Sequence, residues 1–173
     1  MLVLRCTQKL LKRIGPAITG PPESTTALGD WYAGPLAIGH QRYLLLVSER
    51  SRLPVLMPGR DVKHLTAHFP EALARVLEGL GVPAPVISRE IAEAGEIIVA
   101  KTASRSVLGT PNDFSYQLKW QLWDDPAPDL TIEAVRLSHT PVGPLGPGWP
   151  DEVTPRLLGC EAPRFRARRG RAD

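Results

Sequence analysis

The strongest constraint on how this chain can fold is a stretch of extended sequence between residues 31 and 57. It contains three short apolar runs, which are Trp31–Ile38, Tyr43–Ser48 and Leu53–Met57. Gly39 and His40 can turn the chain between the first two runs, and the charged residues 49–52 separate the second run from the third. Short apolar runs separated by turn residues predict an antiparallel meander, in which Pro35 and Pro54 favour edge or bent positions.

Helical patterns lie on both sides of this meander. They predict helices at 8–13, 62–69, 70–79, 85–94, 130–138 and 151–158, with Thr7, Asp61 and Asp129 as N-terminal caps. The apolar residues at 130–138 also fit a strand, and the capping residue before them favours a helix. Two further short strands are expected at 2–4 and 96–101. The sequence therefore predicts a single α+β domain over residues 1–160, in which a small antiparallel sheet packs with several helices.

The formal net charge of +3 lies entirely in the C-terminal segment of the chain. Residues 161–173 contain five arginines against two acidic side chains, which leaves 16 basic and 16 acidic side chains in residues 1–160. The body of the chain is therefore neutral. We expect a disordered basic tail, which either adds non-specific affinity for phosphate backbones or is a solvated terminus.

Several classes of protein are excluded by what the sequence lacks. Cys6 and Cys160 lie at opposite ends without a CxxC pair, so neither a zinc ribbon nor a disulfide framework is expected. The longest aliphatic run, Leu44–Val47, is far shorter than the ~20 residues of a membrane span, and the apolar start of the chain is too short for a signal peptide. The motifs GxGxxG and GxSxG do not occur. We therefore expect a soluble cytoplasmic protein with reduced thiols and without a cofactor.

One pair of histidines has the spacing of a metal site. His64 and His68 are four residues apart on an expected helix, so both side chains can face one ion. The glutamate of an HExxH motif is missing, and only Asp61 and Glu71 are nearby candidates for a third ligand. Such a pair is more often a solvated helix face, so no metal site is expected.

The densest polar chemistry lies at residues 101–113, between an apolar strand and a helix. A Ser/Thr-x-x-Asp/Glu capping box from Thr110 to Asp113 predicts a helix that begins at Thr110, with free backbone amides that favour an anion. The predicted ligand-binding residues are Lys101, Thr102, Ser104, Arg105, Ser106, Thr110, Asn112 and Asp113. The alternative is a polar loop whose side chains form hydrogen bonds with its own backbone. The negative charge of Asp113 would repel an anion at this helix start.

This segment supports two functional hypotheses. The leading one is a binding or interaction module that holds an anionic ligand or nucleic acid at residues 101–113. The alternative is a hydrolase or transferase acting on a phosphate-containing substrate, with Lys101, Arg105 and Asp113 in the site and Glu49 or a histidine as the base. A deep cavity with convergent titratable groups would favour the enzyme.

A third hypothesis, docking of a protein partner, depends on aromatic side chains. Tyr116, Trp120 and Trp123 lie on the helix expected after residue 110, whereas Trp31 and Tyr32 are expected to pack beneath the sheet. Exposure of the first three rings would favour a partner surface, and their burial would exclude it.

Four blocks of the sequence show a resemblance to a known family. They are LRCTQKLLKR at 4–13, STTALGDWYAGPL at 24–36, LVSERSRLPVLMP at 46–58 and AKTASRSVLGTPND at 100–113. In these blocks the chain resembles an uncharacterised bacterial family, which is known only as a domain of unknown function. In that family the last block more usually reads KTxSRSVLGSMND, so Thr110 and Pro111 stand here in place of Ser and Met. The resemblance implies one soluble domain ending near Leu158, with the polar segment as its signature, and it implies no reaction, cofactor or catalytic residue.

Overall fold

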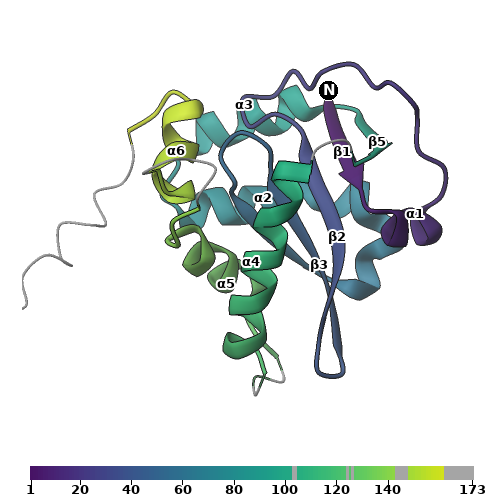
Figure 1. Cartoon of the computed structure of the whole chain (residues 1–173). Coiled ribbons are helices and arrows are strands. Elements are labelled where there is room, and N and C mark those ends of the chain that lie inside the picture. The colour runs from purple at the N-terminus through teal and green to yellow at the C-terminus, as the bar shows by residue number, and fades with distance from the viewer. Residues whose placement is uncertain (103–104, 124, 126, 143–147, 162–173) are drawn as a thin grey trace, which may run out of the picture.

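The computed structural model describes residues 1–102, 105–123, 125, 127–142 and 148–161, with residues 105–111 described by their backbone alone. At its centre is a five-stranded sheet with the order β4-β3-β2-β1-β5 (Figure 1). The strands are β1 (Leu2–Cys6), β2 (Trp31–Ile38), β3 (Gln41–Ser48), β4 (Pro54–Pro58) and β5 (Ile97–Lys101). The helices are α1 (Gln8–Ile14), the 3-10 helix η1 (Gly59–His64), α2 (Leu65–Gly79), α3 (Ala84–Ala94), α4 (Arg105–Gln121), α5 (Leu130–Ser138) and α6 (Pro150–Leu157). One sheet with helices packed around it confirms the predicted α+β class.

The sheet combines antiparallel and parallel pairing. β2, β3 and β4 form the antiparallel meander predicted from the sequence. β1 lies parallel to both β2 and β5, so that Arg5 is aligned with Tyr32 on one side and with Ala100 on the other. The sequence predicts β1 and β5 as strands but not their direction, because parallel pairing depends on long connections that carry the chain back to the same end of the sheet.

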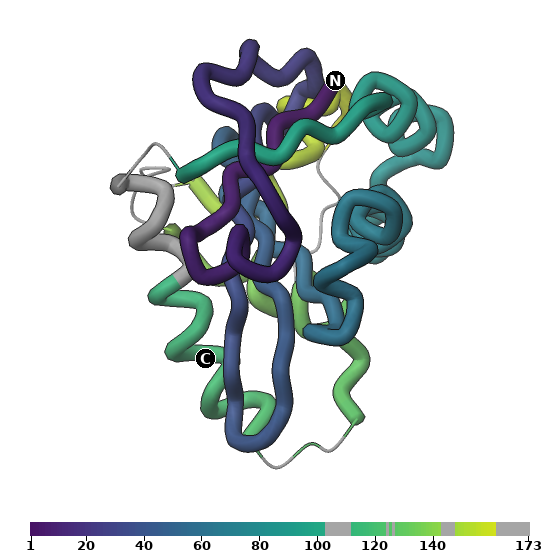
Figure 2. Tube along the Cα trace, turned by 90° about the vertical axis from the view of Figure 1, so that its right-hand side faces the viewer, coloured from purple at the N-terminus to yellow at the C-terminus, as the bar shows by residue number. Residues whose placement is uncertain are grey.

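Different helices cover the two faces of the sheet. Trp31 points to the face covered by α2, where its ring meets Phe69 edge-on at a centroid distance of 5.0 Å. Successive residues of a strand point to opposite faces, so Tyr32 lies on the other side. That side is covered by α4, and Figure 2 shows α4 and α2 on opposite sides of the β2–β3 hairpin. The buried stripe on this side consists of Phe114 and Leu118 of α4 and of Leu122, which follows the helix directly.

The helix after β4 differs from the sequence prediction. The pattern predicts one helix ending at Phe69 and another beginning at Pro70, but α2 is a single helix with Pro70 inside it. Asp61 lies in the first turn of η1 and does not cap an α-helix. The proline removes one backbone hydrogen bond near the start of α2. The helix continues because a single buried apolar stripe runs along it past the proline, formed by Leu65, Phe69, Leu73, Val76 and Leu77.

Two predicted helix caps are confirmed. Thr7 precedes α1, and its side chain accepts a hydrogen bond from the N–H of Leu10 at 3.4 Å. Asp129 precedes α5 and accepts from the N–H groups of Thr131 and Ile132 at 3.0 and 3.1 Å. These bonds satisfy amides that a helix start leaves open. Residues 130–138 are therefore helical, as the capping residue predicted.

The long loop before β2 is fixed by a buried carboxylate. Glu90 of α3 is 2% exposed and accepts hydrogen bonds from the N–H groups of Ala27 and Leu28, at 3.0 and 3.1 Å. Burial raises the pKa of Glu90, and these two bonds lower it in part. The loop therefore returns to the sheet at a position set by α3.

The predicted basic tail lies outside the described residues from residue 162 onward. Within the described residues, no helix has both the length and the apolar character that crossing a membrane would require.

Candidate functional site

The segment at 101–113 folds differently from its prediction. β5 ends at Lys101, and α4 begins at Arg105. The predicted helix start at Thr110 is therefore wrong, because Thr110 and Pro111 lie inside α4. A capping-box pattern within a helix is compatible with continued helix when apolar side chains further on pack against the sheet, as the stripe beginning at Phe114 does.

The structure disperses the predicted ligand-binding residues. Lys101 is exposed at the end of β5, and the N–H of Thr102 donates to the carbonyl of Cys6 at 3.3 Å. Asn112 and Asp113 are exposed on α4. Ser104 lies outside the described residues, and so do the side chains of Arg105, Ser106 and Thr110.

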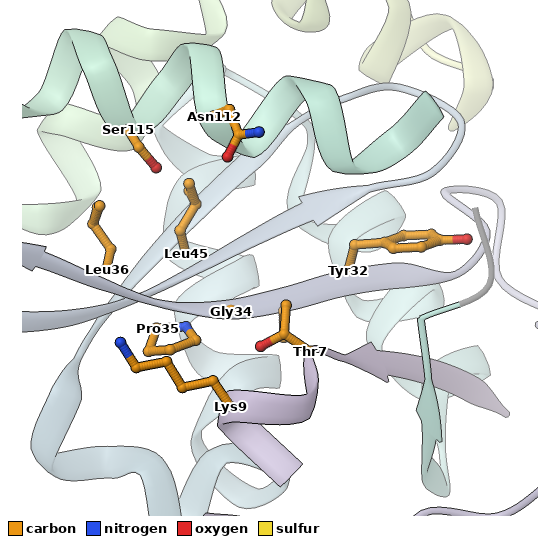
Figure 3. Close-up of a pocket in the computed structure, with 10 residues that line it drawn as sticks. Thr7, Lys9, Tyr32, Gly34, Pro35, Leu36, Leu45, Asn112 and Ser115 are labelled. Carbon is orange, nitrogen blue, oxygen red and sulfur yellow. The ribbon is translucent and has the colours of Figure 1, made fainter. Parts of the chain in front are cut away.

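Asn112 lines a cavity of about 400 Å³ between α4 and the β2–β3 hairpin, close to the start of α1 (Figure 3). Pro35, Leu36 and Leu45 form an apolar wall on the sheet side. The full lining is Thr7, Lys9, Tyr32, Ala33, Gly34, Pro35, Leu36, Leu45, Asn112 and Ser115. An apolar wall with a few polar groups is the usual make-up of a small-molecule site.

The polar groups of this pocket come from two helices. Asn112 and Ser115 point from α4 toward the strands, while Lys9 of α1 extends alongside Pro35 (Figure 3). The Oγ1 atom of Thr7 accepts the capping bond of α1, so its proton remains available to a ligand. Lys9 is the one charged side chain among the lining residues that the structure describes.

A glycine makes room in the pocket floor. Gly34 lines the cavity, and a Cβ built on it would lie 3.3 Å from Cγ2 of Thr7. No backbone atom lies within 4 Å of that Cβ. A larger side chain at residue 34 would therefore extend into the cavity with only a small adjustment of Thr7.

Tyr32 connects the pocket to a group of charged side chains. Its ring closes one end of the cavity, and its hydroxyl points away from the other lining residues (Figure 3). Burial raises the pKa of Tyr32, and Glu49 and Asp30 raise it further, while Arg5 and Arg52 lower it. Four charged side chains therefore act on this hydroxyl.

Two of these four charges neutralise each other. Nε of Arg5 lies 2.5 Å from Oδ2 of Asp30 in an ion pair between β1 and the residue before β2. The other oxygen of Asp30 accepts from the hydroxyl of Ser24 at 2.6 Å. Ser24 in turn accepts from the N–H of Val3 at 2.8 Å. This network is closed and structural.

Arg52 is different, because two nitrogens of its guanidinium are buried and have no partner among the described residues. The residue is 8% exposed, and its Nε and Nη1 atoms have no hydrogen-bond partner within the described part of the chain. Burial lowers the pKa of Arg52, while Glu49 and Tyr32 raise it. Its φ angle of 60° lies in the left-handed region, which is unfavourable for an arginine.

Arg52 is held in this position by serine hydroxyls of the β3–β4 turn. Ser48 Oγ donates to the carbonyl of Leu28 at 2.8 Å and accepts from the N–H of Ser51 at 3.1 Å. Ser51 Oγ donates to Ser48 Oγ at 3.0 Å and accepts from the N–H of Leu53 at 3.3 Å. All of these oxygens are buried, so the turn is rigid. The sequence indicated only a charged turn here, since nothing local distinguishes a buried arginine from an exposed one.

A comparison with protein families matches residues 3–153 to the model of a family described as domain of unknown function (DUF6933). The chain belongs to this family. The match confirms the resemblance to an uncharacterised family and extends over most of the domain. No curated protein and no solved structure matches the chain.

His68, one of the two histidines of this DUF6933 domain with the spacing of a metal site, lines a second cavity of about 490 Å³. The rings of His64 and His68 stack at 5.5 Å, and Nδ1 of His68 lies 3.5 Å from Oδ2 of Asp61. Arg75 and Glu71 form a second pair at 2.5 Å. Among the described residues no three His, Cys, Asp or Glu side chains form a possible metal site. The charged groups here are largely matched with one another, so this cavity is a weaker candidate.

The cysteines offer no activated nucleophile. Cys6 is fully buried, and burial raises the pKa of its thiol to about 12. Burial also raises the pKa of Cys160, a partly exposed residue that follows α6. A thiol is nucleophilic as its thiolate, so neither residue is suited to catalysis at neutral pH.

Three aromatic side chains in the C-terminal part of α4 and just after it lie in solvent. Tyr116, Trp120 and Trp123 are 66%, 75% and 66% exposed, and the first two rings meet edge-on at 6.5 Å. This is the outcome that the partner hypothesis required. Trp31 and Tyr32 are buried, as predicted.

Proposed function

We propose that this DUF6933 domain is a binding module for a small organic anion, which occupies the pocket between α4 and the β2–β3 hairpin. The observation that carries the proposal is the combination of an apolar wall with Lys9 and neutral donors around one cavity. Asn112 links this pocket to the polar segment on which the sequence hypothesis rested.

The charge of the lining supports an anion. Lys9 contributes a positive charge, and Thr7 and Asn112 contribute neutral donors. No carboxylate occurs among the lining residues that are described, and Asp113 on α4 does not line the cavity. A negatively charged group would therefore meet donors without meeting a like charge.

The size of the cavity supports a small molecule over nucleic acid. A volume of about 400 Å³ lies within the range of small-molecule sites. A nucleic acid needs several phosphate contacts from a basic surface. Residues 1–160 carry 16 basic and 16 acidic side chains, so the domain has no net positive charge to offer.

The proposal is tested by titrating the protein with phenyl phosphate, phenol and inorganic phosphate and following backbone amide signals by NMR. We expect phenyl phosphate to bind more tightly than phenol and to shift the amides of Gly34, Leu45 and Ser115. Lys9→Gln should weaken the binding of phenyl phosphate about threefold, because Lys9 supplies the positive charge of the pocket lining. Lys12→Gln is the matched control, because Lys12 is an exposed residue of α1 that does not line the pocket.

Two results would contradict this function. One is an equal loss of affinity for phenyl phosphate in Lys9→Gln and Lys12→Gln. The anion would then be attracted by the overall charge of the protein and not by the pocket. The other is a set of shifted amides that excludes β2 and β3. Tight binding of an oligonucleotide instead of phenyl phosphate would indicate the nucleic-acid alternative.

A second candidate function, hydrolysis or transfer of a phosphate-containing substrate, is supported by Glu49. Its carboxylate raises the pKa values of both Tyr32 and Arg52. A carboxylate can act as a base, and a guanidinium can stabilise negative charge in a transition state. The test is release of p-nitrophenol from p-nitrophenyl phosphate. Faster release by the wild type than by Glu49→Gln would support an enzyme, and equal background rates would leave the binding module.

A further inference from the structure

We propose that Arg52 binds the negatively charged group of the ligand, so that the ligand is an organic oxoanion whose apolar body lies in the pocket and whose charged end lies beside Tyr32. The inference rests on the proposed function and names the anion-binding residue and the class of ligand. It goes beyond the pocket, because Arg52 does not line the cavity.

The first argument is the state of the guanidinium. Buried charged groups are normally paired and hydrogen-bonded. Arg52 is more than nine-tenths buried, and two of its nitrogens lack a partner within the described part of the chain. Arginine is well suited to carboxylate and phosphate oxygens, which would supply the missing acceptors.

The second argument is the balance of charge around Tyr32. Arg5 is neutralised by Asp30 at 2.5 Å. Glu49 is half-buried and acts on Arg52 only through space, because among the described residues no ion pair joins the two. Arg52 therefore remains the cation of this cluster that an incoming anion can neutralise.

The position of Arg52 is fixed by the surrounding turn, and its backbone conformation is unfavourable. The hydroxyls of Ser48 and Ser51 fix the turn through four buried hydrogen bonds. The backbone of Arg52 adopts a φ of 60°, a conformation that strains a residue with a side chain. A rigid turn that holds an unpaired cation is arranged before the ligand arrives, which favours binding.

The pocket lies close to the turn that carries Arg52. Tyr32 lines the cavity and is aligned in the sheet with Val47, and the carbonyl of the next residue, Ser48, accepts from the N–H of Arg52 at 3.2 Å. The ring of Tyr32 lines the cavity, while its hydroxyl lies in the field of Arg52 and Glu49. The Tyr32 hydroxyl is a further donor for the same charged group.

The experiment measures dissociation constants for benzoate, phenyl phosphate and phenol with wild type, Arg52→Gln and Arg50→Gln. Arg50 belongs to the same turn, is exposed and carries the same charge, so it is the matched control. We expect Arg52→Gln to weaken binding of an anion at least about tenfold and to leave phenol within about twofold. Arg50→Gln should bind all three probes like the wild type. A loss confined to phenyl phosphate identifies a phosphate ligand, and a loss confined to benzoate identifies a carboxylate.

Wild-type affinity of Arg52→Gln for both anions would overturn the inference. The proposed function would survive that result if both anions still shift the amides of Gly34 and Leu45, and it would fall if neither anion shifts them. Tyr32→Phe provides a second variant that keeps the ring in the pocket. We expect it to weaken the anions roughly threefold and to leave phenol unchanged; unchanged affinity for all three probes would also count against the inference.

Discussion

Replacing Arg52 by methionine should stabilise the protein. Methionine retains the length and the apolar stem of arginine but removes the charge and the nitrogens that lack partners. A residue kept for binding rather than for the fold is expected to reduce stability.

The size of the effect follows from the contacts of the guanidinium. Two buried donors without partners lower the free energy of unfolding by about 1–3 kcal/mol, and burial of their positive charge lowers it further. The attraction to Glu49 is lost in the variant, and this half-buried interaction is worth at most about 1 kcal/mol. The net gain is about 1–2 kcal/mol in the free energy of unfolding. For a domain of this length it corresponds to a rise in Tm of about 2–8 °C.

The gain is measured by thermal and urea unfolding followed by circular dichroism, with Arg50→Met as the control. That exposed arginine should change the free energy of unfolding by less than about 0.5 kcal/mol. A loss of about 1 kcal/mol or more in Arg52→Met would refute the reasoning, because the guanidinium would then have stabilising partners. Gained stability together with lost binding of organic anions would support a functional role for Arg52.

Three further predictions follow from buried and exposed groups. Burial raises the pKa of Glu90 above its usual value, so the folded state binds the proton more tightly than the unfolded state does. The contribution of Glu90 to the free energy of unfolding should therefore fall as pH rises from about 4.5. Glu90→Gln should abolish that part of the pH dependence, as measured by urea unfolding. Ellman's reagent should react with Cys160 in the native protein, whereas Cys6, with a pKa near 12, should react only after unfolding, and equal rates would contradict the buried position of Cys6. Acrylamide should quench most of the tryptophan fluorescence, because Trp120 and Trp123 are exposed. A variant with phenylalanine at both positions should lose the quenchable fluorescence and keep its stability. Unchanged quenching in that variant would contradict the exposure of these two side chains.

The sheet was predictable because its signals are local. The runs from Trp31 to Met57 and their turns specify the meander, and the capping residues Thr7 and Asp129 mark true helix starts. The box at Thr110 has the same local chemistry but lies inside α4. The difference is tertiary, since a helix start is set by where the apolar stripe docks as well as by its capping residues.

The site was much less predictable. Asn112 came from the dense polar segment, and it does line the pocket. No sequence pattern marked Lys9 or Gly34 as a candidate, because the pocket forms only where α4 packs against β2 and β3, which are distant from it in the sequence. Arg52 was interpreted as part of a charged turn, because its burial depends on tertiary packing that the local sequence does not show. A functional group that is defined by lacking a partner cannot be found before its surroundings are known.

The most direct test of the account is a crystal structure of the wild-type protein with phenyl phosphate. The account predicts the phenyl ring in the pocket beside the ring of Tyr32, with phosphate oxygens at hydrogen-bonding distance, about 2.7–3.2 Å, from the guanidinium of Arg52. A phosphate group bound elsewhere, with the Arg52 nitrogens still unpartnered, would contradict it.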